Sequence, residues 1–318
     1  IRELKAKMEA SITQNGMGVA IVRMLSPLSQ IYHLKDIVSG LGYHHFLSDL
    51  VERLDAEIYE IIEELDWVKN TFFTTNNLIL SLTGGEEEIS VCLADIPQLL
   101  GVVSHEAYEP VENHYHLRNF NEAISAPVKV QFCAKGGNFF RKGYSYSGKL
   151  RVLNSVISNN FLHQELRVKG GAYGAMSQFS PDGYQYFASY RDPNLRETLE
   201  VFDTVADFLR GFSCNKREMD KYIIGEISSL DYPDTPEVLG AKAAEGYITG
   251  FTAADRQQIR DEVLATHVED IRNYADMVEA IMSNNHYAVF GSEAKVQEAA
   301  DLFDAVTPVN KTGHETKR

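Results

Sequence analysis

"ELRVKGGAYGAMSQFSPDGYQYFASYRDP", residues 165–193, is the stretch of sequence that decides the fold. Apolar and aromatic residues alternate on both sides of Pro181-Asp182-Gly183, and such alternation around a turn predicts a β-hairpin. Proline presets the first dihedral angle of the turn and glycine supplies a positive φ. Two glycines, Gly170 and Gly171, separate this hairpin from a helical pattern before it. The order is therefore helix, glycines, hairpin.

The flanking patterns extend this hairpin into a domain. Residues 128–137 read as a strand, 147–167 as a helix, 192–212 as a helix and 286–291 as a strand, with four helices between 215 and 283 and a last one over 292–303. Asp192 and Pro193 are typical of a helix start. The sequence predicts an α+β fold for residues 127–318, an antiparallel sheet covered by helices on one face, and a loose polar tail from Pro308.

Residues 1–105 read as mostly helical, with apolar stripes over 1–12, 19–33 and 46–65 and a short helix over 87–102. One strand is predicted within 71–85, and a single strand needs partners for its backbone groups. We therefore expect residues 1–105 to be the second part of a truncated domain, or else an all-helical domain whose strand joins the next sheet. Residues 101–127 are polar and irregular and contain two prolines, which predicts a linker over 106–126.

Bulk composition narrows the classes of partner. The net charge of −15 argues against nucleic acid, which is bound by neutralising phosphates with Lys and Arg. No apolar run is long enough to predict a membrane span. The three cysteines are far apart and suit a reducing compartment, so we expect a cytoplasmic location, or an organelle matrix for a processed protein, since the chain begins at Ile1.

Several kinds of catalytic site are excluded by the sequence. None of the ten histidines is followed by another four residues later, so neither H-E-x-x-H nor H-x-x-E-H occurs. "KGGAYG" follows a helix and opens a strand, whereas a phosphate loop needs the reverse order. His105, His114 and His116 could together ligate zinc, but they lie in the polar linker and an exposed linker is the favoured interpretation.

What remains as a candidate site is the passage after the first helix: Arg167, Lys169, Gly170, Gly171, Tyr173 and Gly174. Arg167 is either a cation at a helix C-terminus or a forked donor to a peptide carbonyl or carboxylate. Tyr173 combines an apolar ring with a polar tip that suits contact with a substrate backbone. The glycines allow a sharp turn or a close approach by another chain. Composition alone does not decide between the structural and the binding role.

"NNFLHQELRVKGGAYGAMSQFSPDGYQYFASYRDPN" resembles the C-terminal half of pitrilysin/insulinase-type zinc peptidases, above all the presequence protease and falcilysin branch. "EVLGAKAAEGYITGFT" and "SGLGYHHFLSDL" are similar to that branch as well, and "RVKGGAYG" is the most specific element. The resemblance implies four α+β domains in two halves that enclose a chamber. Zinc then belongs to the N-terminal half, which carries the H-x-x-E-H that this chain lacks, and Arg167 and Tyr173 reach across to the peptide.

The resemblance thus implies a non-catalytic C-terminal half, with residues 1–105 as the end of the third domain and 127–318 as the fourth. It implies no metal and no catalytic residue in this chain, an N-terminal catalytic half and peptides as partners, and an inactive isolated fragment. Alternatives are an inactive relative that acts as a binding or scaffold subunit, and a separate zinc enzyme built on the three linker histidines. The acidic composition favours basic peptides as substrates.

Overall fold

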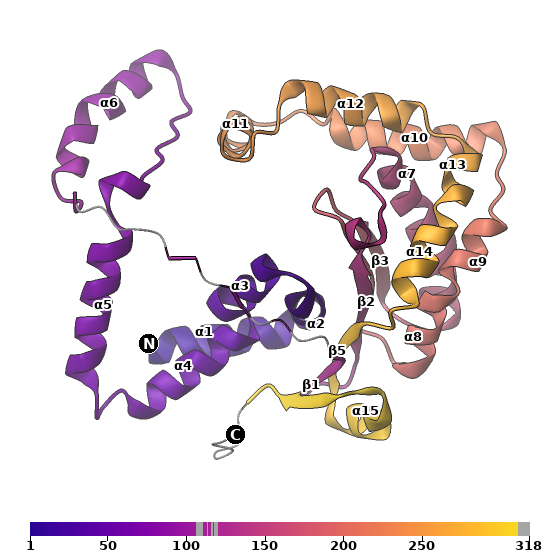
Figure 1. Ribbon diagram of the computed structural model, residues 1–318, viewed down its shortest axis with the longest axis horizontal. Coiled ribbons are helices and arrows are strands. Elements are labelled where there is room, and N and C mark those ends of the chain that lie inside the picture. Colours follow the sequence, from indigo (N-terminus) through magenta and orange to yellow (C-terminus); the bar gives the residue numbers. More distant parts are fainter. Residues whose placement is uncertain (106–110, 113, 116, 118–119, 311–318) are drawn as a thin grey trace. The chain divides into compact units, whose positions relative to one another are not determined.

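The computed structural model describes residues 1–105, 111–112, 114–115, 117 and 120–310 (Figure 1). They form two compact units. Unit 1 comprises residues 1–51, 114–230 and 258–318, and unit 2 comprises residues 52–113 and 231–257. This grouping differs from the expected division near residue 105, because the first 51 residues pack with the sheet of the later part. The assignment to a third and a fourth peptidase-like domain stays a prediction.

Unit 1 is built on a six-stranded sheet with the order β3-β4-β2-β5-β1-β6. Its strands are β1 (Glu122–Ala126), β2 (Phe132–Asn138), β3 (Gly174–Phe179), β4 (Tyr184–Tyr190), β5 (Tyr287–Ser292) and β6 (Ala305–Pro308). The α+β class is confirmed, and so is the hairpin, since β3 and β4 pair antiparallel around Gly183, whose φ is +88°. The sheet is mixed, however, because β1 runs parallel to both β5 and β6.

Two of these strands correct the sequence prediction. Residues 122–126, expected in the linker, form β1, and β6 lies where the loose tail was expected to begin. β1 carries Glu122, which is 2% exposed, and a buried carboxylate hides the strand from a search for apolar alternation. Its charge is compensated by Arg23, which donates to both carboxylate oxygens at 2.7 and 2.9 Å. Arg23 also donates to Asp36 at 2.7 Å.

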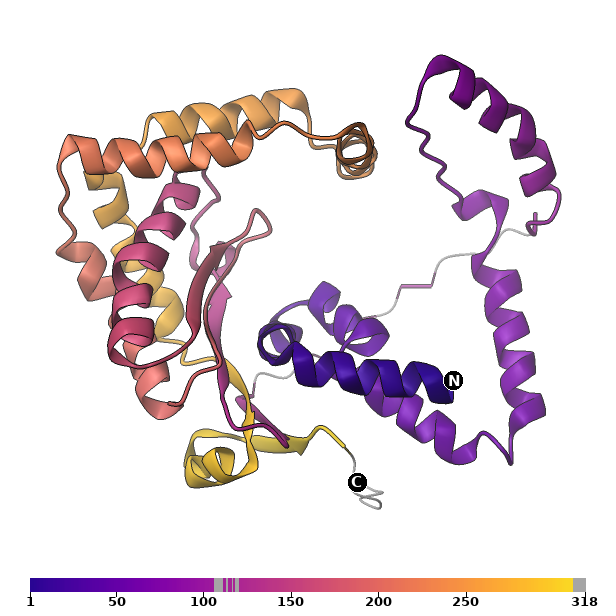
Figure 2. The same ribbon diagram turned by 180° about the vertical axis from the view of Figure 1, so that it is seen from behind.

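One face of the sheet packs against the central helices of the later sequence (Figures 1 and 2). These elements are α7 (Lys149–Val156), its π-helical continuation η4 (Ile157–Lys169), α8 (Arg196–Asp203), α9 (Val205–Arg210), α13 (Val268–Asn273) and α14 (Ala275–Met282). Inward side chains of the strands, such as Cys133, Phe187 and Val289, join the helices in a continuous buried core.

The opposite face is covered too, which corrects the prediction of a sheet with helices on one face. The neighbours of these residues along the strands, such as Phe132, Ala134 and Phe290, point to the other face of the sheet. There they pack with α2 (Gly16–Leu25). The approach is close, since a Cβ on Gly16 would lie 2.7 Å from the Phe132 and Phe290 rings. Residues 16–25 lie more than 100 positions before these strands, and sequence periodicity carries no information about such pairing.

The remaining elements of unit 1 surround this core. They are α1 (Arg2–Gln14), η1 (Ser26–Leu28), α3 (Gln30–Ser39), η3 (Phe140–Lys142), α10 (Lys216–Leu230), α15 (Glu293–Glu298) and η5 (Ala300–Leu302). The helix expected over 19–33 breaks at Ser26-Pro27, because proline fits the first turn of a helix but not its interior. Two helices, α4 (Leu41–Arg53) and α12 (Ala253–Leu264), extend across the boundaries between units.

Unit 2 holds α5 (Ile58–Phe72), η2 (Thr75–Asn77), α6 (Glu86–Leu100) and α11 (Pro236–Thr249). The strand expected within 71–85 is wrong. Helix α5 continues to Phe72, and in this segment the only ladder contact among described residues is an isolated bridge between Thr74 and Ser104. The segment is rich in β-branched and aromatic residues, but no neighbouring strand is there to pair with it. Because β-propensity depends on such pairing, composition alone does not make this segment a strand.

Candidate functional site

The candidate site begins where η4 ends in a tight turn. The Gly170 amide donates to the Glu165 carbonyl at 2.9 Å, and the Ala172 amide donates to the Leu166 carbonyl at 2.9 Å. Gly171 has a φ of +81°, a left-handed conformation that side chains disfavour. The chain therefore reverses direction between Lys169 and Ala172 and enters β3, as the order of helix, glycines and hairpin predicted.

Arg167 and Tyr173 are brought together by this turn. The Arg167 guanidinium carbon lies 5.9 Å from the centroid of the Tyr173 ring, a cation–π geometry. Both side chains are exposed, and Tyr173 keeps 67% of its surface accessible. No described carboxylate forms an ion pair with Arg167. The pair thus presents guanidinium donors and a phenol to the surroundings.

The other residues predicted in this loop have structural partners. Lys169 lies 2.7 Å from the Glu165 carboxylate one helical turn earlier, so its ammonium is held along η4. The Gly170 carbonyl accepts a hydrogen bond from the Asn194 amide at 2.7 Å. Gly174 opens β3 opposite Tyr190, where a Cβ would make an ordinary contact at 3.9 Å. These three residues shape the loop, and the exposed donors are those of Arg167 and Tyr173.

A second segment, Tyr190–Asn194, forms the adjoining wall of the site. The Tyr190 ring lies 5.9 Å from the Tyr173 ring in an edge-to-face arrangement. It is anchored from behind by Phe132 at 5.4 Å, which in turn contacts Phe290 at 5.9 Å. Together with Tyr184 and Tyr186, Tyr190 packs on the α2 side of the sheet, as expected for tyrosines on one face of the hairpin. The ring of the exposed Tyr173 is therefore supported by a series of ring contacts through Tyr190 and Phe132 to Phe290.

The same wall carries a clamp that the sequence did not reveal. Asp192 is buried, and its carboxylate accepts hydrogen bonds from the Asn194 amide at 2.9 Å and the Thr198 hydroxyl at 2.7 Å. Burial nevertheless raises the pKa of Asp192. We expected Asp192 to cap the next helix directly, but α8 begins only at Arg196, and Asp192 instead closes the intervening turn. The run Arg191-Asp192-Pro193-Asn194 predicts helix initiation, and nothing else in the sequence marks this turn.

The described residues offer little to a metal ion or to nucleophilic chemistry. They contain no group of three or more His, Cys, Asp or Glu side chains that could hold a metal ion. His105 shares a hydrogen bond with the Thr75 hydroxyl at 3.3 Å, while His116 lies outside the described residues. Cys133 is fully buried, and burial raises the pKa of its thiol, which disfavours the nucleophilic thiolate. The described side chains therefore do not fit a zinc centre.

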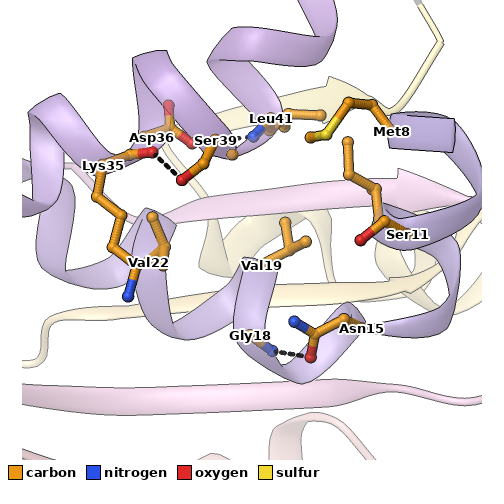
Figure 3. Close-up of a pocket in the computed structure, with 12 residues that line it drawn as sticks. Met8, Ser11, Asn15, Gly18, Val19, Val22, Lys35, Asp36, Ser39 and Leu41 are labelled. Atoms are coloured by element: carbon orange, nitrogen blue, oxygen red, sulfur yellow. Dashed lines mark hydrogen bonds between the residues drawn. The ribbon is translucent and has the colours of Figure 1, made fainter. Parts of the chain in front are cut away.

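A cavity of about 170 Å³ lies among α1, α2, α3 and the start of α4 (Figure 3). Three of its polar side chains are already hydrogen-bonded to the surrounding helices. Asn15 accepts from the Gly18 amide at 3.2 Å, Ser39 donates to the Lys35 carbonyl at 2.9 Å, and Asp36 accepts from the Leu41 amide at 3.1 Å. The Asn15, Ser39 and Asp36 side chains are therefore engaged within the fold.

No helix in the described part of the chain is both long and apolar enough to cross a membrane.

Comparisons with known proteins bear on the site and the fold. A family model described as the PreP C-terminal domain matches residues 121–291. The chain is 36% identical over 311 residues to protein HypA of Clostridium perfringens, covering 98% of this chain and 32% of that protein. It is 31% identical over 291 residues to presequence protease 1, chloroplastic/mitochondrial, of Arabidopsis thaliana, covering 88% of this chain and 26% of that protein. The chain thus spans about a quarter to a third of the length of these relatives.

Similarity to a solved structure bears on the fold and not on the function. The peptidase M16 inactive domain from Pseudomonas fluorescens superposes with a TM-score of 0.50 at 14% identity, covering 92% of this chain and 69% of that one.

Proposed function

The chain belongs to the PreP C-terminal domain family of the M16 peptidases, and on that premise we propose that it is the non-catalytic C-terminal half of a zinc-dependent peptidase. In this proposal the N-terminal half binds zinc and supplies the catalytic groups, and the two halves enclose the peptide. The chain is expected to hydrolyse no peptide by itself. The observation that carries the proposal is the exposed pair of Arg167 and Tyr173, held together at 5.9 Å on a turn that has no other evident use for them.

The geometry supports a substrate-binding role over a helix-capping one. Arg167 is two residues from the end of η4, yet its guanidinium lies over the Tyr173 ring, beyond the turn. A guanidinium in that position can donate two parallel hydrogen bonds to a peptide carbonyl or carboxylate. Tyr173 can donate its phenol proton to a neighbouring carbonyl. Such donors hold a peptide in register and stabilise negative charge that develops on its carbonyl during hydrolysis.

The test is to change these two residues in the full-length protein that contains this chain. Arg167→Ala should lower kcat/KM for a fluorogenic peptide by roughly 100-fold, the effect of removing one preorganised donor, and Tyr173→Phe by a smaller factor. Zinc content should stay unchanged in both. Arg217→Ala serves as the matched control, because Arg217 is an exposed arginine on α10, outside the candidate site.

Three results would contradict the proposal. They are unchanged cleavage in both variants, loss of zinc together with activity, and chelator-sensitive hydrolysis by the isolated chain. Unfolding of both variants, detected by circular dichroism, would favour the structural role of the pair.

A further inference from the structure

Arg191 has an unusual backbone conformation at the edge of the candidate site. Its φ is +49°, and in the described part of the chain only Asn285 shares a positive φ among residues with a side chain. Asparagine tolerates this region, whereas for arginine it costs conformational energy. Residues held in such conformations concentrate at binding and catalytic sites. The strain at Arg191 therefore calls for an explanation in the surrounding contacts.

The neighbouring backbone holds Arg191 in place from both sides. Its carbonyl accepts a hydrogen bond from the Tyr173 amide at 3.3 Å. The next residue, Asp192, exchanges two backbone hydrogen bonds with Gln131 at 2.8 and 2.7 Å, and its buried side chain forms the clamp described above. Pro193 lies 3.6 Å from the position that a Cβ on Gly171 would take. Arg191 is thus fixed against the turn that carries Arg167 and Tyr173.

The side chain of Arg191 is exposed and directed onto an aromatic ring. Its guanidinium carbon lies 5.5 Å from the centroid of the Tyr190 ring. With the contacts described above, Arg167, Tyr173, Tyr190 and Arg191 form a continuous row, in which a guanidinium contacts each of the two edge-to-face tyrosines. No described carboxylate forms an ion pair with Arg191, although the chain carries 45 acidic residues against 30 basic ones. Its donors remain available to a ligand.

We propose that Arg191 is a second substrate-binding residue, which forms with Tyr190 a subsite for a carboxylate carried by the peptide. The inference rests on the proposed function of the chain as part of a peptidase and assigns this subsite to the same wall. A guanidinium matches a carboxylate with two parallel hydrogen bonds, and its stacking on Tyr190 reduces the freedom that binding would cost. The carboxylate can belong to an Asp or Glu side chain or to the C-terminus of the peptide.

The charge preference of this subsite is opposite to the preference for basic peptides that the overall composition suggests. A net charge of −15 favours basic peptides over the whole surface. Arg191 presents an exposed guanidinium that no described carboxylate pairs with, so a lysine or arginine at the corresponding position of the peptide is repelled by it. The expected substrate is therefore basic along most of its length and carries a carboxylate, or no charge, at the position that meets Arg191.

Four labelled peptides test the proposal by fluorescence anisotropy with the 318-residue chain. One pair has a single internal Glu or Gln, and the other pair is otherwise neutral with a free or an amidated C-terminus. We expect the carboxylate member of at least one pair to bind about tenfold more tightly, the effect of one charge-assisted bidentate contact. The pair that discriminates identifies the source of the carboxylate.

Variants separate binding from folding. Arg191→Gly removes the side chain and suits the positive φ, so it should keep or raise thermal stability while abolishing the discrimination. Arg191→Lys keeps the charge but loses the fork, and should retain only part of it. Arg217→Gln is the control that should change nothing. Equal binding within both pairs by the unmodified chain, or discrimination that survives Arg191→Gly, would overturn the inference.

A cleavage assay with the full-length protein distinguishes this inference from the proposed function. If that protein cleaves none of the peptides, the proposed peptidase function fails, while the anisotropy still reports on Arg191. If it cleaves them with equal KM for carboxylate and neutral members and Arg191→Gly changes nothing, the proposed function stands and the subsite at Arg191 is wrong.

Discussion

Unit 1 and unit 2 bury their apolar side chains to very different extents. Unit 1 has a core on each face of its sheet, with residues such as Leu153, Phe187 and Phe290 fully buried. In unit 2, Ile61 is the only hydrophobic side chain among the described residues that is buried, and α6 and α11 bury none. Large side chains such as Trp67, Phe73 and Tyr247 are more than half exposed. Unit 1 therefore has the contacts of an independently stable fold, and unit 2 lacks them.

This difference in packing bears on the candidate site, because the site lies on the well-packed sheet of unit 1. The Tyr173–Tyr190 pair stands on Phe132 and Phe290, which belong to the best-packed part of the molecule. A site built on a sheet holds its donors more accurately than one on loosely packed helices. The proposed substrate wall thus lies in the unit that can position it.

The largest effect that we predict is the loss of stability on truncating a buried aromatic residue of unit 1, compared with an exposed aromatic residue of unit 2. Phe290→Ala should lower the free energy of unfolding by about 3–5 kcal/mol, because it leaves a cavity against Phe132 and α2. The matched change Phe73→Ala should cost less than about 0.5 kcal/mol, since Phe73 is 68% exposed. Urea denaturation of both variants measures the contrast. Similar losses would mean that unit 2 has a core of its own.

Hydrogen exchange should show a smaller but more extended difference. Amides of β2 and β5, in the centre of the sheet, should exchange only through global unfolding, whereas those of α6 should exchange through local opening. We expect at least a roughly 100-fold difference in rate, about 2.7 kcal/mol in opening free energy. Mass spectrometry of peptides from 86–100 and 287–292 measures it. Equal protection would contradict the comparison.

The same contrast explains how far the sequence predicts the structure. The hairpin, η4 and the helices α10, α11 and α12 follow from local periodicity and turn residues, and the structure confirms them. The strand expected within 71–85 fails because local propensity has no partner to pair with there. β1 was missed because its Glu122 is buried through an ion pair with Arg23, a contact between residues 99 positions apart.

Within the candidate site, too, some residues can be predicted from local sequence and others cannot. Arg167 and Tyr173 are six positions apart on a turn marked by glycines, so sequence reasoning could place them together. The contribution of Arg191 depends on a positive φ at a residue that normally avoids it, and on the clamp at Asp192. Neither feature has a residue pattern of its own, because both depend on the isolated bridge between Asp192 and Gln131, which lies beside the pairing of the interior strands β2 and β4.

The smallest effect that we predict concerns pH and again separates the units. His286 is buried immediately before β5, where its ring Nε2 lies 2.6 Å from the Met24 carbonyl near the end of α2. Burial lowers the pKa of His286, although that hydrogen bond opposes the shift. In the unfolded chain the pKa returns to about 6.5, so below that value the unfolded state binds more protons. The free energy of unfolding should therefore fall as the pH drops from 7 towards 5.

The slope assigned to this one group cannot exceed about 1.4 kcal/mol per pH unit. His286→Gln should reduce the slope without abolishing it, because burial also lowers the pKa of His44 on α4. His105→Gln, at an exposed position of unit 2, is the control and should leave the slope unchanged. Urea denaturation of the three proteins at pH 7.0, 6.0 and about 5 measures the slopes. An equal reduction by both substitutions would mean that the pH dependence does not come from the contact between α2 and the sheet.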